Sequence, residues 1–268
     1  MEVNKSDLLS LFRTLVTLKP YLEEIVIVGG WVPFLYWKYG EIPARHPSVR
    51  TMDIDIAVPR QVPDNGRPTV DNLLSKAGYT AKVFGPANHP VVKYELASPV
   101  TEIEFITPEI GRPGEPSIVV QKGLRAQSLR YVQIVLENTR QIMINDSMAG
   151  ININAFTRVP SPAAFVFQKA LTLPLRRSKA AKDLYYIFNL LDSTTEMQDL
   201  IPAEIRLLRA QYASKWLSSA IRNLENYFPA SGGGGPALLA TQYTGTMNVE
   251  VFRNYAQRIF REFLERLK

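Results

Sequence analysis

The segment at residues 51–58, TMDIDIAV, constrains the fold of this chain most, because it alternates acidic with aliphatic residues. Successive side chains of a strand point to opposite faces, so Asp53 and Asp55 would share one face while Ile54 and Ile56 share the other. Two carboxylates this close repel each other and raise each other's pKa unless a cation lies between them. The pattern therefore predicts a strand that carries either a solvated acidic face or a metal site.

The segments on either side of this strand add to the pattern. Upstream, the strand-like run EEIVIV ends at Gly29 and Gly30, and a helix is expected from Trp31. Glycines allow close backbone approach, and the free N–H groups at the start of a helix suit a phosphate. Downstream, TEIEFIT predicts a strand that carries Glu104, with Glu102 as its rival on the same face. Taken alone, a glycine pair after a strand is more often a plain turn.

Strand-like and helical segments are distributed unevenly along the 268 residues. Up to about residue 154 they are mixed, and the run LRYVQIVL at residues 129–136 is interpreted as a strand. From Ser161, which is placed to cap a helix that has Pro162 in its first turn, the pattern is helical. We therefore expect an α+β fold, with a mixed sheet flanked by helices and followed by a C-terminal helical domain.

The composition excludes several classes of protein. The chain has no cysteine and two histidines, which rules out a disulfide scaffold, a thiol nucleophile and a histidine-rich metal centre. No run approaches the roughly 18 apolar residues of a membrane span, and the N-terminus does not have the pattern of a signal peptide, so we expect a cytoplasmic protein without a membrane partner. The net charge of +6 favours an anionic partner such as a nucleotide or a nucleic acid.

The motifs VGGWVPFLYW, RTMDIDIAV and IEFI together resemble the nucleotidyltransferase superfamily, which has the polymerase-β-like fold. The resemblance covers roughly residues 25–106. It implies a catalytic domain at residues 1–157 and a helical domain at 158–268. The sequence departs from the family pattern at the turn, where it has Gly-Gly-Trp and many members have Gly-Ser.

The resemblance also implies roles for individual residues. Bound nucleotide would lie against Gly29, Gly30 and Trp31. Asp53 and Asp55 would ligate Mg²⁺, with Mn²⁺ as a substitute. The third acid, Glu104 or else Glu102, would complete a second metal site or act as a base toward the acceptor.

The segment SPAAFVFQKALTLPLRRSKAAKDLYYIFNLL is similar to the region after the core in AbiEii-type nucleotidyltransferases, which include toxins of toxin–antitoxin systems. The positions that match the functional ones are Lys169, Lys182 and Asp183. Lys169 would bind a nucleotide phosphate, and Asp183 would position Lys169 or the acceptor. The alternative is a solvated lysine and a surface pair of Lys182 with Asp183. Arg176 and Arg177 are either phosphate or RNA contacts or part of a solvated basic turn.

The function expected from these features is transfer of a nucleoside monophosphate from a nucleoside triphosphate to an acceptor hydroxyl. An RNA or tRNA end is the favoured acceptor, with a protein or a small molecule as alternatives, and an antitoxin protein is a further expected partner. The competing class is a non-catalytic nucleotide-sensing or partner-binding module of the same fold. A third, weaker hypothesis is a nucleic-acid-binding protein without a nucleotide site.

Two further groups of side chains have more than one interpretation. The aromatic residues of the helix after the glycine pair either stack a base or belong to the core (Trp31, Phe34, Tyr36, Trp37 and Tyr39). His46 lies in a proline-containing loop beside Arg45, where we expect an exposed side chain or a substrate contact.

Overall fold

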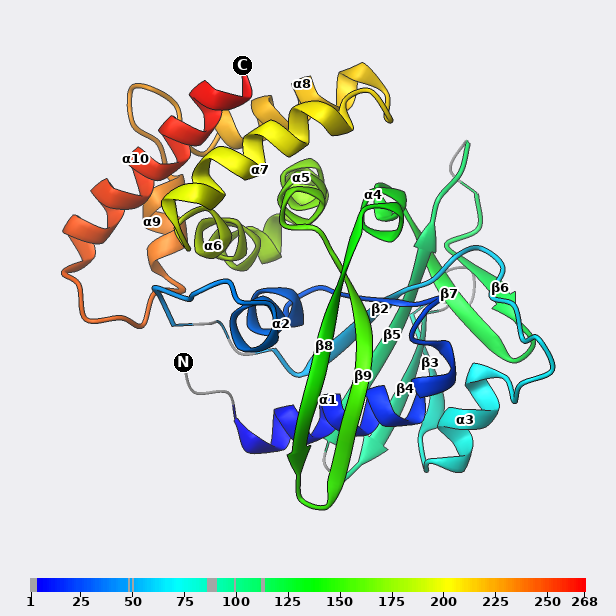
Figure 1. Cartoon of the computed structure of the whole chain (residues 1–268). Coiled ribbons are helices and arrows are strands. Elements are labelled where there is room, and N and C mark those ends of the chain that lie inside the picture. Colours follow the sequence, from blue (N-terminus) through cyan, green and yellow to red (C-terminus); the bar gives the residue numbers. More distant parts are fainter. Residues whose placement is uncertain (1–3, 48, 50, 86–90, 99, 112–113) are drawn as a thin grey trace. The chain divides into compact units, whose positions relative to one another are not determined.

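The computed structural model describes residues 4–47, 49, 51–85, 91–98, 100–111 and 114–268 (Figure 1). The chain divides into two compact units. We call Val3–Leu35 with Arg50–Pro160 the sheet unit, and Tyr36–Val49 with Ser161–Lys268 the helical unit. The expected fold class, a mixed sheet flanked by helices with a C-terminal helical region, is confirmed. The domain boundary between residues 157 and 158 stays a prediction.

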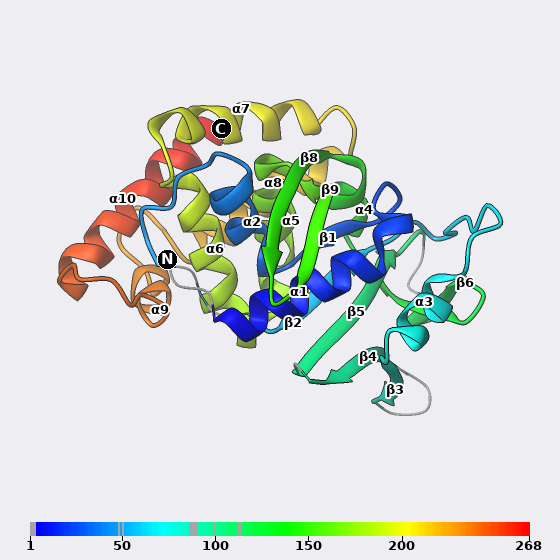
Figure 2. The same ribbon diagram turned by 60° about the horizontal axis from the view of Figure 1, so that its bottom comes forward.

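A mixed sheet, seven-stranded within the described residues, forms the centre of the sheet unit. Five strands lie in the order β1-β2-β5-β4-β3, while β7 pairs with β5 and β6 pairs with β7. β5 is parallel to β2 and β7 and antiparallel to β4. Figure 2 shows β5, β4 and β3 side by side. The strands are β1 (Val26–Val28), β2 (Asp53–Ala57), β3 (Thr80–Phe84), β4 (Val91–Ala97), β5 (Val100–Pro108), β6 (Ser117–Gln121) and β7 (Leu124–Leu129).

The two faces of β2 differ as its alternating sequence predicts. Ile54 and Ile56 are fully buried, whereas Asp53 and Asp55 are half-buried. Other elements of the unit contribute further buried residues to its core. They are α1 (Lys5–Thr17), the short helix Lys19–Tyr21, the first part of α2 (Trp31–Tyr39), α3 (Val70–Lys76), α4 (Val132–Glu137) and the two-stranded ribbon of β8 (Thr139–Met148) and β9 (Ile151–Pro160).

The interpretation of residues 129–136 as a strand is wrong. β7 ends at Leu129, Tyr131 adopts a left-handed φ of 68°, and α4 follows from Val132. A residue with that φ cannot continue a strand, so the chain turns here. Val132 and Val135 then pack with Val26, Val28 and Ala57 in one buried cluster. Tertiary packing of this short apolar run therefore overrides its β-branched composition.

The helical unit contains α5 (Pro162–Thr172), α6 (Ala180–Leu191), α7 (Thr195–Leu208), α8 (Ser214–Glu225), α9 (Gly235–Ala240) and α10 (Val249–Leu267). The predicted start of α5 is confirmed, because the Ser161 hydroxyl accepts a hydrogen bond from the Ala164 N–H at 3.2 Å and Pro162 occupies the first turn. α5 is buried on nearly every side, which its apolar sequence favours. Among the described residues, no helix is both long and apolar enough to cross a bilayer.

Candidate active site

Gly29 lies directly against the carboxylate of Asp55. β1 is antiparallel to β2, and Val28 pairs with Asp55, so the turn after Val28 meets this side chain. A Cβ added to Gly29 would lie 2.0 Å from Asp55 Oδ2, and Gly29 has a φ of 70°. Both the close approach and the left-handed backbone require glycine here. The predicted turn and the predicted acid pair are therefore one feature of the structure.

One face of the sheet gathers the candidate acids. Asp53 pairs with Glu102 and Asp55 with Glu104 across the parallel strands β2 and β5, so both candidate third acids stand beside the pair. On the other side of β5, Lys93 of β4 pairs with Glu104. Within the described parts of β1 to β5, this face carries five carboxylates and two lysines: Asp53, Asp55, Glu95, Glu102, Glu104, Lys82 and Lys93. The excess of negative charge favours a bound cation.

Lys93 joins the two candidate third acids. Its Nζ lies 2.6 Å from Glu104 Oε1 and 2.9 Å from Glu102 Oε2. Burial alone would lower the pKa of Lys93, but hydrogen bonds to Glu104 and Glu102 outweigh it and raise the pKa well above its usual value. The ammonium therefore stays charged. Sequence reasoning missed this residue, although the alternation in VVKYELA places Lys93 and Glu95 on one face.

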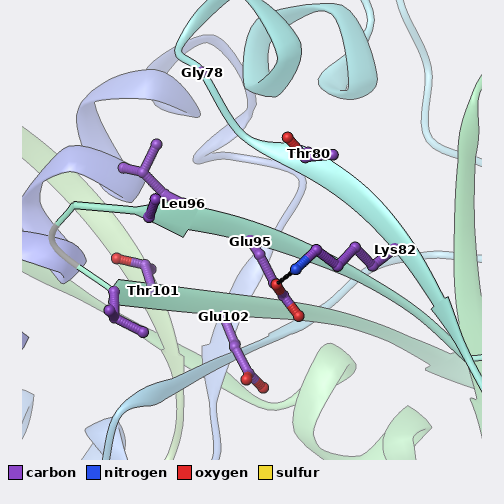
Figure 3. Close-up of a pocket in the computed structure, with 9 residues that line it drawn as sticks. Gly78, Thr80, Lys82, Glu95, Leu96, Thr101 and Glu102 are labelled. Carbon is purple, nitrogen blue, oxygen red and sulfur yellow. Dashed lines mark ion pairs between the residues drawn. The ribbon is translucent and has the colours of Figure 1, made fainter.

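Glu104 has a second partner. Gln127 of β7 donates a hydrogen bond from Nε2 to Glu104 Oε2 at 3.3 Å, so both carboxylate oxygens are engaged. Glu95, by contrast, pairs with Lys82, as the dashed line in Figure 3 marks. Together with Glu102, these two residues line a cavity of about 440 Å³ between β3, β4 and β5.

Asp53 and Asp55 fit a divalent cation better than Glu104 does. Magnesium is commonly held by one or two carboxylates together with substrate phosphates. The aspartate pair supplies two carboxylates without a third acid. Across the described ranges, no three histidine, aspartate or glutamate side chains gather as a ready metal site. Phosphate oxygens of a substrate could complete the coordination of a cation at the aspartate pair.

The turn and helix next to Asp55 have the expected form. Gly29 and Gly30 form a turn, and α2 starts at Trp31. The Trp31 side chain is only 1% exposed and packs edge-to-face on Phe34, with ring centroids 5.6 Å apart. Phe34 and Tyr36 are buried too, so these three rings belong to the core and do not stack a base. Trp31 can reach a nucleotide only through its backbone.

Lys169 and Asp183, in the helical unit, form a buried ion pair. Lys169 Nζ lies 2.7 Å from Asp183 Oδ1, and both side chains are at most 4% exposed. Arg176 Nη1 lies 3.5 Å from Asp183 Oδ2. The alternatives of a solvated Lys169 and a surface pair of Lys182 with Asp183 are therefore wrong. Arg176 contacts the buried Asp183 carboxylate, so it is not simply part of a solvated turn. Arg177 is exposed.

The expectation of an exposed His46 is also wrong. Its side chain is 10% exposed, and its Nε2 lies 2.6 Å from Oδ2 of the buried Asp192. Asp192 Oδ1 also accepts a hydrogen bond from the Tyr255 hydroxyl. Arg45 lies 3.8 Å away at the same oxygen. Asp192 is more than 140 positions away from both Arg45 and His46 in the chain, so no local sequence pattern predicts this cluster. Arg50, part of the motif before Asp53, lies outside the described residues.

Comparison with known proteins identifies the family of the chain. The family model described as nucleotidyltransferase matches residues 7–205, which span the acidic sheet face as well as Lys169 and Asp183. No curated protein matches the chain, and no solved structure matches it either. The match covers well over half of the 268 residues. The chain belongs to the nucleotidyltransferase family.

Proposed function

We propose that this chain is a magnesium-dependent enzyme that transfers a nucleoside monophosphate from a nucleoside triphosphate to an acceptor hydroxyl. The observation that carries the proposal is the contact between Gly29 and the Asp55 carboxylate. It joins a turn suited to phosphate with a pair of carboxylates suited to a divalent cation.

The residues divide the reaction between them. The backbone of Gly29, Gly30 and Trp31 binds the triphosphate, and Asp53 and Asp55 hold Mg²⁺ or Mn²⁺. When bound, the metal neutralises charge on the triphosphate and on the departing pyrophosphate. The acceptor oxygen forms a bond to the α-phosphorus, the bond from that phosphorus to the β-phosphate oxygen breaks, and the hydroxyl proton leaves to solvent. Positioning and charge neutralisation supply most of the rate.

Lys169 and Asp183 are proposed to serve this reaction as a pair, as the resemblance to AbiEii-type proteins implies. Lys169 would meet a phosphate as a point charge, and Asp183 would hold its ammonium in place. The distance of 2.7 Å between Nζ and Oδ1 supports the positioning part of this role. Lys169→Arg keeps the charge but changes its geometry. We expect that variant to fold and to raise KM for the triphosphate; an unchanged KM would contradict the role of Lys169.

An RNA or tRNA end is the acceptor that we favour, because the chain carries a net charge of +6. An RNA acceptor would bind through several phosphates, so its affinity should fall steeply as salt rises. A small molecule such as an aminoglycoside, or a protein hydroxyl, would show little of this dependence. A toxin role, with an antitoxin as partner, predicts that the chain arrests growth when expressed alone and that Asp55→Asn does not.

A catalytically silent nucleotide-binding module is the second candidate, favoured by one observation: Lys93 already neutralises the third acid. The two functions differ in one product. Incubation with each labelled triphosphate, magnesium and total RNA should give label in RNA and one pyrophosphate per nucleotide transferred. Magnesium-dependent nucleotide binding without pyrophosphate would identify the silent module and contradict the proposed enzyme.

A further inference from the structure

Lys93 lies next to Glu104, the residue expected from the sequence to be the third acid. Asp55, Glu104 and Lys93 lie in one row across β2, β5 and β4, because each is the register partner of the next. Neighbouring strands are roughly 4.8 Å apart, so the row spans about 10 Å. A positive charge is thus built into the sheet face two strands from the aspartates.

Several contacts hold this ammonium. Glu104 Oε1 lies at 2.6 Å and Glu102 Oε2 at 2.9 Å. The ring of Phe84, on β3, lies 5.6 Å away on the same face. The Lys93 side chain is 23% exposed, and that of Glu104 is 20% exposed. Water can therefore weaken these contacts only in part.

The same contacts make Glu104 a poor ligand for a divalent ion. Its Oε1 contacts the Lys93 ammonium, and its Oε2 accepts a hydrogen bond from Gln127. A divalent cation at Glu104 would also lie within a few ångströms of the Lys93 ammonium, and like charges that close cost free energy.

We propose that Lys93 takes the place of a second metal ion. In this arrangement Asp53 and Asp55 hold a single divalent cation, while Glu104 and Glu102 hold Lys93, whose fixed charge faces the substrate phosphates. The inference rests on the nucleotidyl transfer proposed above. It makes Glu104 a positioning residue that acts through Lys93 and is neither a metal ligand nor the base.

Binding of Mn²⁺, followed by electron paramagnetic resonance and calorimetry in the presence of a non-hydrolysable triphosphate, tests the proposal. The wild-type protein should bind one Mn²⁺ at the protein–triphosphate complex. Asp55→Asn should lower the affinity at least about tenfold, and Glu104→Gln should change it less than about twofold. Glu102→Gln, which removes the other partner of Lys93, is the matched control and should behave like Glu104→Gln.

Two lysine variants separate charge from shape. Lys93→Met leaves two carboxylates without their ammonium, so a second Mn²⁺ should bind. Lys93→Arg keeps the charge, so the number of bound Mn²⁺ ions should stay at one. If Lys93→Met does not fold, the comparison of Glu104→Gln with Asp55→Asn still decides the matter.

The outcomes distinguish this inference from the function on which it rests. Two Mn²⁺ ions in the wild-type protein would overturn the inference alone, provided that transfer is observed. The inference would also be overturned if Glu104→Gln lowered the affinity for Mn²⁺ as much as Asp55→Asn does. A wild-type protein that neither binds Mn²⁺ nor transfers nucleotide would overturn the proposed function itself.

Discussion

Two lysine–carboxylate clusters, one in each unit, differ in how far water reaches them. Lys169 and Asp183 are at most 4% exposed, whereas Lys93, Glu102 and Glu104 are between 20% and 36% exposed. A buried carboxylate that loses its cation stays desolvated and unpaired, while a half-exposed one regains water. Breaking the first cluster should therefore cost its unit more stability than breaking the second.

The largest effect is expected from Lys169→Met. It leaves Asp183 buried beside the more distant Arg176, so the free energy of unfolding should fall by about 3–5 kcal/mol. Urea unfolding measures this loss. The double variant Lys169→Met/Asp183→Leu removes the orphaned charge and should recover at least half of the stability. A loss below about 1 kcal/mol in the single variant would contradict the contrast between the clusters.

Gly29→Ala should have an intermediate effect on stability and a large one on binding. The new Cβ meets Asp55 Oδ2 and the φ is left-handed, so we expect a cost of about 1–2 kcal/mol or more and at least a tenfold weaker affinity for Mn²⁺–triphosphate. Gly66→Ala is the matched control, because Gly66 has a φ of 77° but no atom within 4 Å of its added Cβ. It should lose only the stability that the left-handed backbone costs, which is less than in Gly29→Ala, and keep its affinity. Equal affinities in the two variants would disprove the role of the Gly29 contact.

A smaller effect on stability is expected from Lys93→Met. Its ion pairs are partly solvated, so the free energy of unfolding should fall by no more than about 1 kcal/mol. Lys82→Met, which removes a more exposed lysine from the same face, provides the comparison and should change stability even less. Urea unfolding of both variants and of Lys169→Met ranks the three lysines by how much each contributes to the free energy of unfolding. A loss in Lys93→Met as large as in Lys169→Met would show that exposure does not separate the clusters.

The predictable part of this molecule lies in short-range patterns. Alternation along β2 predicts that Asp53 and Asp55 share a face, and the glycine pair predicts the turn before α2, which the structure places against Asp55. Ser161 and Pro162 likewise predict the start of α5. Each of these inferences depends on residues that are neighbours in sequence.

The remaining features depend on pairings between distant segments. Nothing local states that Glu104 lies between Asp55 and Lys93, because that follows from the order of β2, β5 and β4. The same is true of His46, whose partner Asp192 is 146 positions away. α4 was missed for a related reason, since its valines are held as a helix by packing against β1 and β2.

The most direct test of the account is nucleotide transfer by Asp55→Asn. Wild-type and variant proteins with matching melting temperatures are incubated with labelled triphosphate, magnesium and total RNA, and the released pyrophosphate is counted. Loss of a ligand to the proposed metal should remove several kcal/mol of transition-state stabilisation, so transfer should fall on the order of 100-fold or more. Transfer by Asp55→Asn within twofold of the wild-type rate would contradict the assignment of this sheet face as the active site.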